Sequence, residues 1–397
     1  MKTIKASVFF AFLLAFFALS YTQAASNVSE DTRYFVQTTK GFWKSTLGVR
    51  NTFDDGFTTD LSDWQLRLTK IAGLKVYPVK KLSILPTSGE VVVPEGKSAK
   101  PIPRPTPSEQ VPWGIKILYG NPLLTKSSGG AGVVVAVLDT GVFKDHPDLK
   151  SRIHDCKDFT QSKPIVDGKC EDRNGHGTHV AGIIAADGGA DGLGIYGVAP
   201  DASLFAYKVC SANGSCWSDD IAVALRTAAD NGANIVNLSL GSDTLSSLIA
   251  DAINYATDKG VLVVAAAGND GPYLESIDYP AALVPVVGVG ALDATSNIAD
   301  WSSRGVNSTD TAYLKEEKDI EFAVPGVNIE STWKDGAYVI LSGTSMAAPH
   351  IVGFAAKLWQ KDAPKPAEAT RELLHTLSHD ILPAGDDDAS GWGLPHL

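Results

Sequence analysis

The run Gly132-Val-Val-Val-Ala-Val-Leu-Asp-Thr-Gly141 decides the fold of this chain. Its first seven residues are apolar or β-branched without polar alternation, which is typical of a strand buried on both faces of a sheet. Asp139 follows directly, so a carboxylate is expected at the carboxyl end of this strand. Because functional groups of open parallel sheets gather at the carboxyl ends of the strands, Asp139 is the first candidate for a functional residue.

Three more apolar runs lie further along the chain, at residues 203–209, 234–240 and 260–266. Helical patterns separate them, from Ser218 to Asn231 and from Thr244 to Lys259, and a glycine follows each. We expect Ser218 to cap the first helix. This alternation predicts an α/β fold with three layers, a parallel β-sheet with helices on both faces.

Composition and charge narrow the class of protein. The 397 residues are 44% hydrophobic and 20% charged, which is ordinary for a globular protein and excludes disordered, collagen-like and coiled-coil chains. Residues 1–107 hold 14 Lys and Arg against 8 Asp and Glu, whereas residues 108–397 hold 20 against 37. An acidic body binds nucleic acid poorly, so we expect no nucleic-acid partner.

The N-terminus has the pattern of an export signal. Lys2 and Lys5 precede an apolar run over residues 8–19, and Thr22-Gln23-Ala24 offers small residues for cleavage. The alternative, a membrane anchor, needs about 18–20 apolar residues, and this run is shorter. We therefore predict a signal peptide over residues 1–24 and a secreted, extracellular protein without a membrane anchor.

The region between the signal and the acidic body forms a second part. Residues 74–79 alternate in a way that suits a strand, and a proline-rich tract over residues 101–107 predicts an exposed linker where processing enzymes cut. One interpretation of residues 25–107 is a removable propeptide, and the alternative is an independent N-terminal module. The opposite net charges of the two parts favour the propeptide.

Four cysteines are too few for a disulfide scaffold, but they lie close together in pairs. Cys156 with Cys170, and Cys210 with Cys216, suit two local loop disulfides in an oxidising compartment. The alternative, four free thiols, does not fit a secreted protein.

Two further polar blocks complete a possible catalytic set. Asn174-Gly-His-Gly-Thr-His-Val-Ala-Gly182 places glycines around His176, and Ser342-Gly-Thr-Ser-Met-Ala-Ala-Pro-His350 places Ser345 at the expected start of a helix. Free N–H groups and the helix dipole favour a developing oxyanion there. Singly, the three residues could be a strand-end carboxylate, a core histidine and a helix cap. Together they suggest nucleophilic catalysis.

These three blocks resemble the signatures of the subtilases, a family of subtilisin-like serine endopeptidases, and the similarity extends over about residues 108–394. The resemblance implies that Ser345 attacks the scissile carbonyl, His176 transfers the proton and Asp139 orients the histidine. It also implies a zymogen, in which a small α+β propeptide acts as intramolecular chaperone and inhibitor of a catalytic domain over residues 108–397.

A fourth block, Ala265-Ala-Ala-Gly-Asn-Asp-Gly271, also resembles the family. The resemblance implies that the side-chain amide of Asn269 donates a hydrogen bond to the oxyanion, beside the N–H of the nucleophilic serine. The alternative is that Asn-Asp-Gly is a plain turn.

The substrate-binding segments follow from the same resemblance. It implies that the substrate backbone pairs with Ser239, Leu240 and Gly241, which also form one wall of the pocket. The second wall is expected at Ala266, Ala267 and Gly268, and the pocket floor at Asp278. With Asp270 at the rim, two carboxylates would favour Lys or Arg before the cut. Alternatively both acids are solvated, and the loop from Pro272 to Ile277 departs from the family pattern.

The resemblance also implies a structural calcium ion, with oxygen ligands from Asp148, Gly189, Asp191, Leu193 and Ile195. Glu109 stands where the family has an N-terminal amide ligand. His176 and His179 lack the further ligands that zinc needs, and we expect no organic cofactor.

The alternatives to a protease are a lipase or esterase and an inactive binding protein. A lipase or esterase of the α/β-hydrolase type needs the order Ser, Asp, His and a Gly-x-Ser-x-Gly turn, which this sequence lacks. An inactive binding protein would lack one of the catalytic residues, whereas Asp139, His176, Asn269 and Ser345 are all present here. We therefore expect protein and peptide substrates, the chain's own propeptide as a partner, and a monomer.

Overall fold

The computed structural model describes residues 32–85, 88–89, 102–161, 165–306, 315–382 and 385–397. The chain divides into two compact units, of which the first ends at Val79 and the second begins at Lys80. The predicted signal peptide lies outside the described residues. The predicted domain boundary at residue 107 stays a prediction.

The first unit is a small α+β fold. Its antiparallel sheet has the order β2-β1-β3 and is joined by two helices, with the bounds β1 Arg33–Gln37, α2 Gly41–Leu47, β2 Phe57–Asp60, α3 Asp63–Ile71 and β3 Lys75–Pro78. Val36, Leu47, Phe57 and Leu61 form its core. Apolar burial holds this sheet and its helices together.

The second unit is built on an eight-stranded sheet in the order β15-β14-β13-β11-β6-β9-β7-β8. All neighbours are parallel except β7 and β8. The strands are β6 Val134–Asp139, β7 Ile153–Asp158, β8 Val166–Asp167, β9 Ser203–Lys208, β11 Ile235–Leu238, β13 Leu262–Ala266, β14 Val286–Leu292 and β15 Phe322–Pro325. Every residue of β11, β13 and β14 is buried, as the unbroken apolar runs predicted for the first two.

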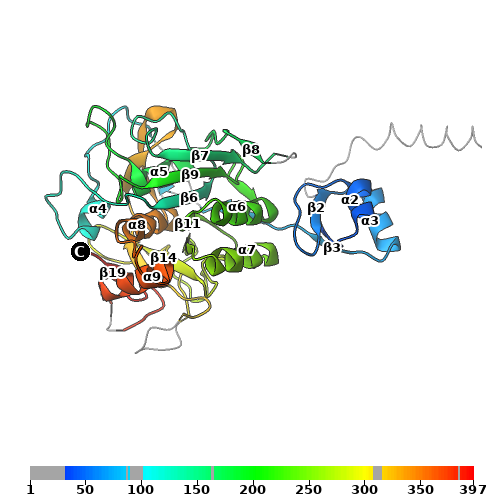
Figure 1. The fold of residues 1–397 in the computed structure, drawn as a ribbon. Helices are drawn as coiled ribbons and strands as arrows, with labels where there is room; N and C mark the ends of the chain where they lie inside the picture. Colours follow the sequence, from blue (N-terminus) through cyan, green and yellow to red (C-terminus); the bar gives the residue numbers. More distant parts are fainter. Residues whose placement is uncertain (1–31, 86–87, 90–101, 162–164, 307–314, 383–384) are drawn as a thin grey trace, which may run out of the picture. The chain divides into compact units, whose positions relative to one another are not determined.

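Helices cover both faces of this sheet (Figure 1). The helices α5 and α8 pack together on one face, and α6 and α7 pack together on the other. The helix bounds are α4 Trp113–Leu118, α5 His176–Ala185, α6 Ser218–Asp230, α7 Ser247–Asp258, α8 Thr344–Lys357 and α9 Pro366–Thr376. The predicted three-layer α/β fold is confirmed.

Two details of the predicted helices are wrong. The helix α7 begins at Ser247 rather than Thr244, because the Thr244 N–H is held in a turn by the hydroxyl of Ser242. Ser218 is the first residue of α6 and not its cap, since the extended residue before the helix is Trp217. The predicted ends are close, and glycines with positive φ follow both helices.

Three small sheets complete the second unit. Their orders are β10-β4-β12, β16-β17-β5 and β18-β19, with the bounds β4 Lys81–Ile84, β5 Ser88–Gly89, β10 Ser215–Trp217, β12 Leu240–Gly241, β16 Ile329–Thr332, β17 Tyr338–Ser342, β18 Ser378–His379 and β19 Leu394–Pro395. A short 3₁₀ helix spans Lys334–Gly336. Among the described helices, none has the length and apolar character that crossing a bilayer requires.

Candidate active site

Three elements of the second unit bring the predicted catalytic residues together. Asp139 is the last residue of β6, His176 is the first residue of α5, and Ser345 is the second residue of α8. The side chains of Asp139 and Ser345 are fully buried, and that of His176 is 2% exposed. The site therefore lies at the carboxyl end of the sheet, where two helix N-termini meet a strand end.

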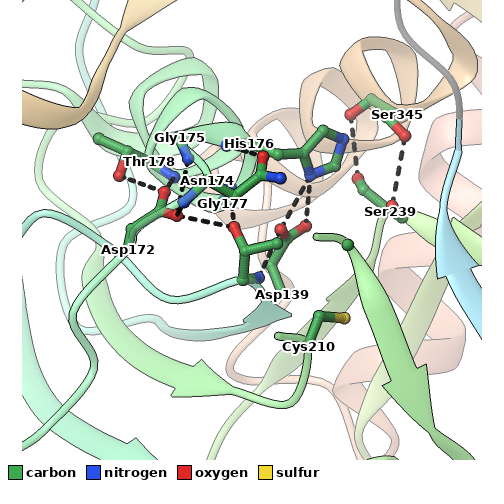
Figure 2. Close-up of polar contacts among 12 residues, drawn as sticks. Asp139, Asp172, Asn174, Gly175, His176, Gly177, Thr178, Cys210, Ser239 and Ser345 are labelled. Atoms are coloured by element: carbon green, nitrogen blue, oxygen red, sulfur yellow. Dashed lines mark hydrogen bonds and ion pairs between the residues drawn. The ribbon is translucent and has the colours of Figure 1, made fainter. Parts of the chain in front are cut away.

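The carboxylate of Asp139 forms hydrogen bonds with the imidazole of His176 (Figure 2). The Nδ1 atom lies 2.8 Å from Oδ1 and 2.9 Å from Oδ2, and the N–H of Thr140 donates to Oδ1 at 2.6 Å. Because a carboxylate only accepts hydrogen bonds, the proton belongs on Nδ1 and the lone pair on Nε2. This is the tautomer that a general base needs.

The free nitrogen of His176 faces Ser345 (Figure 2). Its Nε2 is buried and has no hydrogen-bond partner within the described residues. The Ser345 hydroxyl instead donates to the carbonyl of Ser239 at 3.3 Å, and the Ser239 hydroxyl donates to the Ser345 carbonyl at 2.9 Å. Catalytic hydrogen bonds are commonly looser without substrate than in the reacting complex.

The side-chain amide of Asn269 is held against the start of α8. Its Oδ1 accepts hydrogen bonds from the N–H and the hydroxyl of Thr344, both at 3.0 Å. Because the carbonyl end is fixed in this way, the orientation of the NH2 end is fixed too. Asn269 is therefore bound to Thr344, the residue that precedes the predicted nucleophile Ser345, and its side chain has a defined orientation.

Two glycines let the His176 loop approach its neighbours. Gly175 has a φ of 115°, and a Cβ there would lie 2.4 Å from the ring of Trp333. A Cβ on Gly177 would lie 2.1 Å from the carbonyl oxygen of Gly141. A side chain at position 175 would collide with Trp333, and one at position 177 would push α5 away from the end of β6.

The predicted pocket segments lie around Asp278. Its N–H donates to the Ala267 carbonyl at 2.8 Å. Its Oδ2 lies 2.6 Å from a Cβ built on Gly241 and 3.0 Å from one built on Gly268. The carboxyl group is thus packed between the two predicted walls, and Asp278 is 3% exposed. Ala266 and Ala267 are fully buried.

Asp278 belongs to a group of three carboxylates. Oxygens of Asp243, Asp270 and Asp278 all lie within 4.8 Å of one another, the first two residues being exposed. Burial, followed by repulsion from Asp270 and Asp243, raises the pKa of Asp278 to about 7. The charge of this group therefore changes in the neutral range.

The predicted calcium loop brings two carboxylates to one place. A Cβ on Gly189 would lie 2.9 Å from Oδ1 of Asp148 and 3.4 Å from Oδ1 of Asp191. Asp148 is 1% exposed, and its Oδ2 accepts hydrogen bonds from the Ile195 N–H and the Tyr338 hydroxyl, both at 2.8 Å. Its buried Oδ1 has no hydrogen-bond partner in the described chain. A buried acceptor of this kind fits a cation.

Leu193 and Ile195, predicted to bind calcium through their backbone carbonyls, lie in the same loop as Asp191. Leu193 lies in the loop with an exposed side chain, and its N–H donates to Asp191 at 3.0 Å. The carboxylate of Glu109 forms an ion pair with Lys116 at 2.6 Å. Its neighbour Gln110 contacts the loop, donating to the carbonyl of Gly192.

Both predicted disulfides are confirmed. Cys156 is bonded to Cys170 and Cys210 to Cys216, with Cα separations of 5.2 and 4.2 Å. The first joins β7 to the loop that leads to His176, and the second closes the turn between β9 and β10. Closure of a loop near 15 residues stabilises a fold by about 3 kcal/mol in the entropy model.

A segment that was not expected from the sequence lies beside the predicted substrate-pairing edge. The strand β4 pairs antiparallel with Leu240–Gly241 on one side and with β10 on the other, and Ser83 is opposite Gly241. Further on, Ser88–Gly89 pairs with Leu341–Ser342, just before α8. β4 thus pairs with the segment that follows Ser239, and β5 pairs with the strand that precedes Ser345.

Comparisons with known proteins agree with the motifs. A model of the subtilase family matches residues 130–393. A subtilisin from Bacillus sp. (strain TA39) is 46% identical over 370 residues, which are 88% of this chain and 86% of that protein. Subtilisin Savinase from Lederbergia lenta is 40% identical over 287 residues, 72% of this chain and 97% of that protein. The solved structure of Sphericase matches with a TM-score of 0.70 and 48% identity, covering 73% of this chain and 99% of that one.

Proposed function

Because the chain belongs to the subtilase family and is a serine endopeptidase, we propose that Ser345, His176 and Asp139 are its catalytic triad. The observation that carries this proposal is the Asp139–His176 pair, which leaves Nε2 facing the hydroxyl at the start of α8. We assign Asn269 as an oxyanion donor because Thr344 holds its amide one residue from Ser345.

The proposed reaction forms and breaks an acyl-enzyme. Ser345 Oγ attacks the scissile carbonyl carbon as its proton passes to Nε2 of His176, and Asp139 stabilises the imidazolium. The amide of Asn269 and the N–H of Ser345 donate to the oxyanion. The Nε2 proton then moves to the leaving amine as the C–N bond breaks. Water, activated by the same imidazole, releases the acid from Ser345.

The proposal includes synthesis as a secreted zymogen that cleaves itself. Residues 1–24 would direct export, and the two disulfides suit an oxidising compartment. The strand β4 supports self-cleavage, because it pairs in the antiparallel manner in which an extended peptide adds to a sheet edge. With β5 paired before α8, a first cut between Ile84 and Ser88 fits these two pairings.

Self-cleavage is tested by the intact masses of the secreted wild type and of Ser345→Ala. We expect the wild type to lose a fragment that ends between residues 84 and 88, or after trimming near residues 104–110, while Ser345→Ala stays joined. Identical cleavage of both proteins would show that another protease does the processing. A Ser331→Ala variant is the control, because that serine is buried but bonds to the His179 carbonyl.

The proposed preference for Lys or Arg before the cut rests on Asp278 and its two acidic neighbours. A cation in a partly desolvated pocket beside a carboxylate gains more than it would in water. Because the pKa of Asp278 is raised to about 7, this attraction grows as pH rises through neutrality. Below that pKa the neutral carboxyl group accepts apolar side chains more readily.

The pH dependence of specificity checks this preference. We expect the ratio of kcat/KM for Lys against Leu before the cut to rise roughly 5- to 10-fold between pH 6 and pH 9, about 1 kcal/mol in differential attraction. In Asp278→Asn the ratio should lose this rise. A ratio that is flat in the wild type, or rises equally in Asp278→Asn, would contradict the role of Asp278.

We also propose that calcium binds the loop of Asp148, Gly189, Asp191, Leu193 and Ile195. The oxygen-only donors and the unpartnered Oδ1 of Asp148 fit this ion. Calcium there would tie the loop to the segment before β7 and take no part in the chemistry.

Chelation tests the calcium proposal. A ligand present at about 100 times its dissociation constant stabilises by about 2.7 kcal/mol, so EDTA should lower the melting temperature by roughly 5–10 °C. The melting temperature of Asp148→Ala should be lower than that of the wild type and should not change in EDTA. The change in Asp293→Asn lies in an exposed loop, so EDTA should lower its melting temperature as much as that of the wild type. An unchanged wild-type melting temperature in EDTA would rule the ion out as a stabiliser.

Protein substrates follow from the family, and we propose the chain's own N-terminal unit as a further partner and a monomeric mature enzyme. Sedimentation of the processed wild-type enzyme should give the mass of a single chain, and the mass of a dimer would contradict the monomer.

A further inference from the structure

We propose that Asp172 is a positioning residue that fixes His176 relative to Asp139 through shared hydrogen bonds. The hydrogen bonds that its carboxylate accepts from the described residues come from the residues around His176 and Asp139. The inference rests on the proposed function, because it assigns Asp172 a role in that same reaction. Its basis is the number and placement of the bonds that one buried carboxylate accepts (Figure 2).

The carboxylate of Asp172 organises the loop that leads into α5. Its Oδ1 accepts the N–H groups of Asn174 at 3.0 Å and Gly175 at 2.7 Å. Its Oδ2 accepts the N–H and the hydroxyl of Thr178 at 2.9 and 2.6 Å. Thr178 is the third residue of α5, so Asp172 satisfies a backbone donor that the helix itself leaves unpaired. Its negative charge at this N-terminus also suits the helix dipole.

The same carboxylate is linked to the strand that carries Asp139. The Thr140 hydroxyl donates to Oδ1 of Asp172 at 2.9 Å and accepts the N–H of Gly177 at 3.0 Å. The Thr140 N–H donates to Asp139. Thr140 therefore joins the end of β6 to the first turn of α5, and Asp172 anchors both. His176 lies inside this closed set of contacts, between Gly175 and Gly177.

A buried cation completes the arrangement. Lys208, the last residue of β9, is 9% exposed, and its Nζ donates to the carbonyl of Thr140. Burial lowers the pKa of Lys208, while Asp172, Asp158 and Asp139 oppose that shift. The ammonium group thus offsets negative charge at Asp172 and binds the backbone carbonyl of Thr140. Asp172 is itself 4% exposed, so its bonds are shielded from water.

The test compares Asp172→Asn with the wild type on a peptide substrate. The asparagine oxygen can keep the three bonds at Oδ1, but its NH2 group would face the donors of Thr178. We expect kcat to fall about 10- to 100-fold with KM changed less than threefold, since small misplacements of a catalytic group carry losses of that order. The acid limb of the kcat/KM profile, which reports the imidazolium of His176, should shift to lower pH because Asp139 holds it less well.

Three measurements separate positioning from general damage. Active-site titration counts competent sites, so that rates are compared per site, and Thr140→Val removes the hydroxyl link without removing a charge. Thr140→Val should also lower kcat and shift the acid limb. Asp293→Asn is the matched control, because Asp293 accepts similar N–H and hydroxyl bonds from Thr295 in an exposed loop. It should keep wild-type kinetics.

Two results would overturn the inference. In one, both Asp172→Asn and Thr140→Val keep wild-type kcat and pH profile per competent site. In the other, activity falls only in proportion to the number of titrated sites, which is the signature of misfolding. Failure of the proposed function would look different, because Ser345→Ala would then retain activity, and the role of Asp172 in that reaction would fall with the triad.

Discussion

Replacing Ser345 by alanine is expected to lower kcat for a peptide substrate by about 10⁶-fold, a magnitude borrowed from the triad of the related subtilisin. The hydroxyl is the proposed nucleophile, and it lies where His176 can take its proton. Without it no acyl-enzyme can form. The rate of hydrolysis by the purified variant, measured with wild-type contamination excluded by mass spectrometry, checks this.

The fold should survive the Ser345→Ala change, because only one hydrogen bond to the Ser239 carbonyl is lost. Far-UV circular dichroism and the melting temperature should therefore match the wild type closely. Substantial residual hydrolysis by the folded variant would remove Ser345 from the role of nucleophile. His176→Ala provides a second variant, for which a loss of similar size is expected because the two groups act as a unit.

Replacing Asn269 by alanine is expected to lower kcat roughly 10²- to 10³-fold, again a value taken from subtilisin, with little change in KM. The proposed hydrogen bond forms to the oxyanion and not to the ground-state carbonyl, so it contributes mainly to the transition state. The kinetic constants for one peptide, measured per titrated site, check this expectation.

Asn297→Ala is the control for this change, since Asn297 lies in a polar loop closed by its bonds to Asp293. It should behave as the wild type does. A rise in KM at constant kcat in Asn269→Ala would instead assign Asn269 to ground-state binding. Unchanged constants would leave the oxyanion to other donors.

The core of the fold could be predicted from the sequence because its strands are continuous apolar runs. β9, β11 and β13 lie within predicted runs, and β6 extends one residue past its run, which places Asp139 at the carboxyl end of the sheet. Helix ends were less accessible, since they depend on local bonds such as that between Ser242 and Thr244. Disulfide pairing followed from close spacing alone.

Contacts between distant segments could not be read from spacing. The pairing of β4 with Leu240–Gly241 joins residues far apart in sequence, and nothing in Lys81–Ile84 identifies its partner. The sequence around Asp172 does not indicate that its carboxylate accepts hydrogen bonds from Thr140 and Thr178. The ion pair of Glu109 with Lys116 was likewise not expected from the sequence.

A fluorophosphonate that phosphonylates activated serines tests the proposed chemistry most directly. The protein is incubated with the reagent, digested, and the modified residue is identified by peptide mass spectrometry. We predict a single adduct on Ser345 in the wild type, none in Ser345→Ala, and labelling slowed by at least about 10³-fold in His176→Ala, since the activating base is then missing. An adduct on another residue, or equal labelling of Ser345 with and without His176, would contradict the proposed triad.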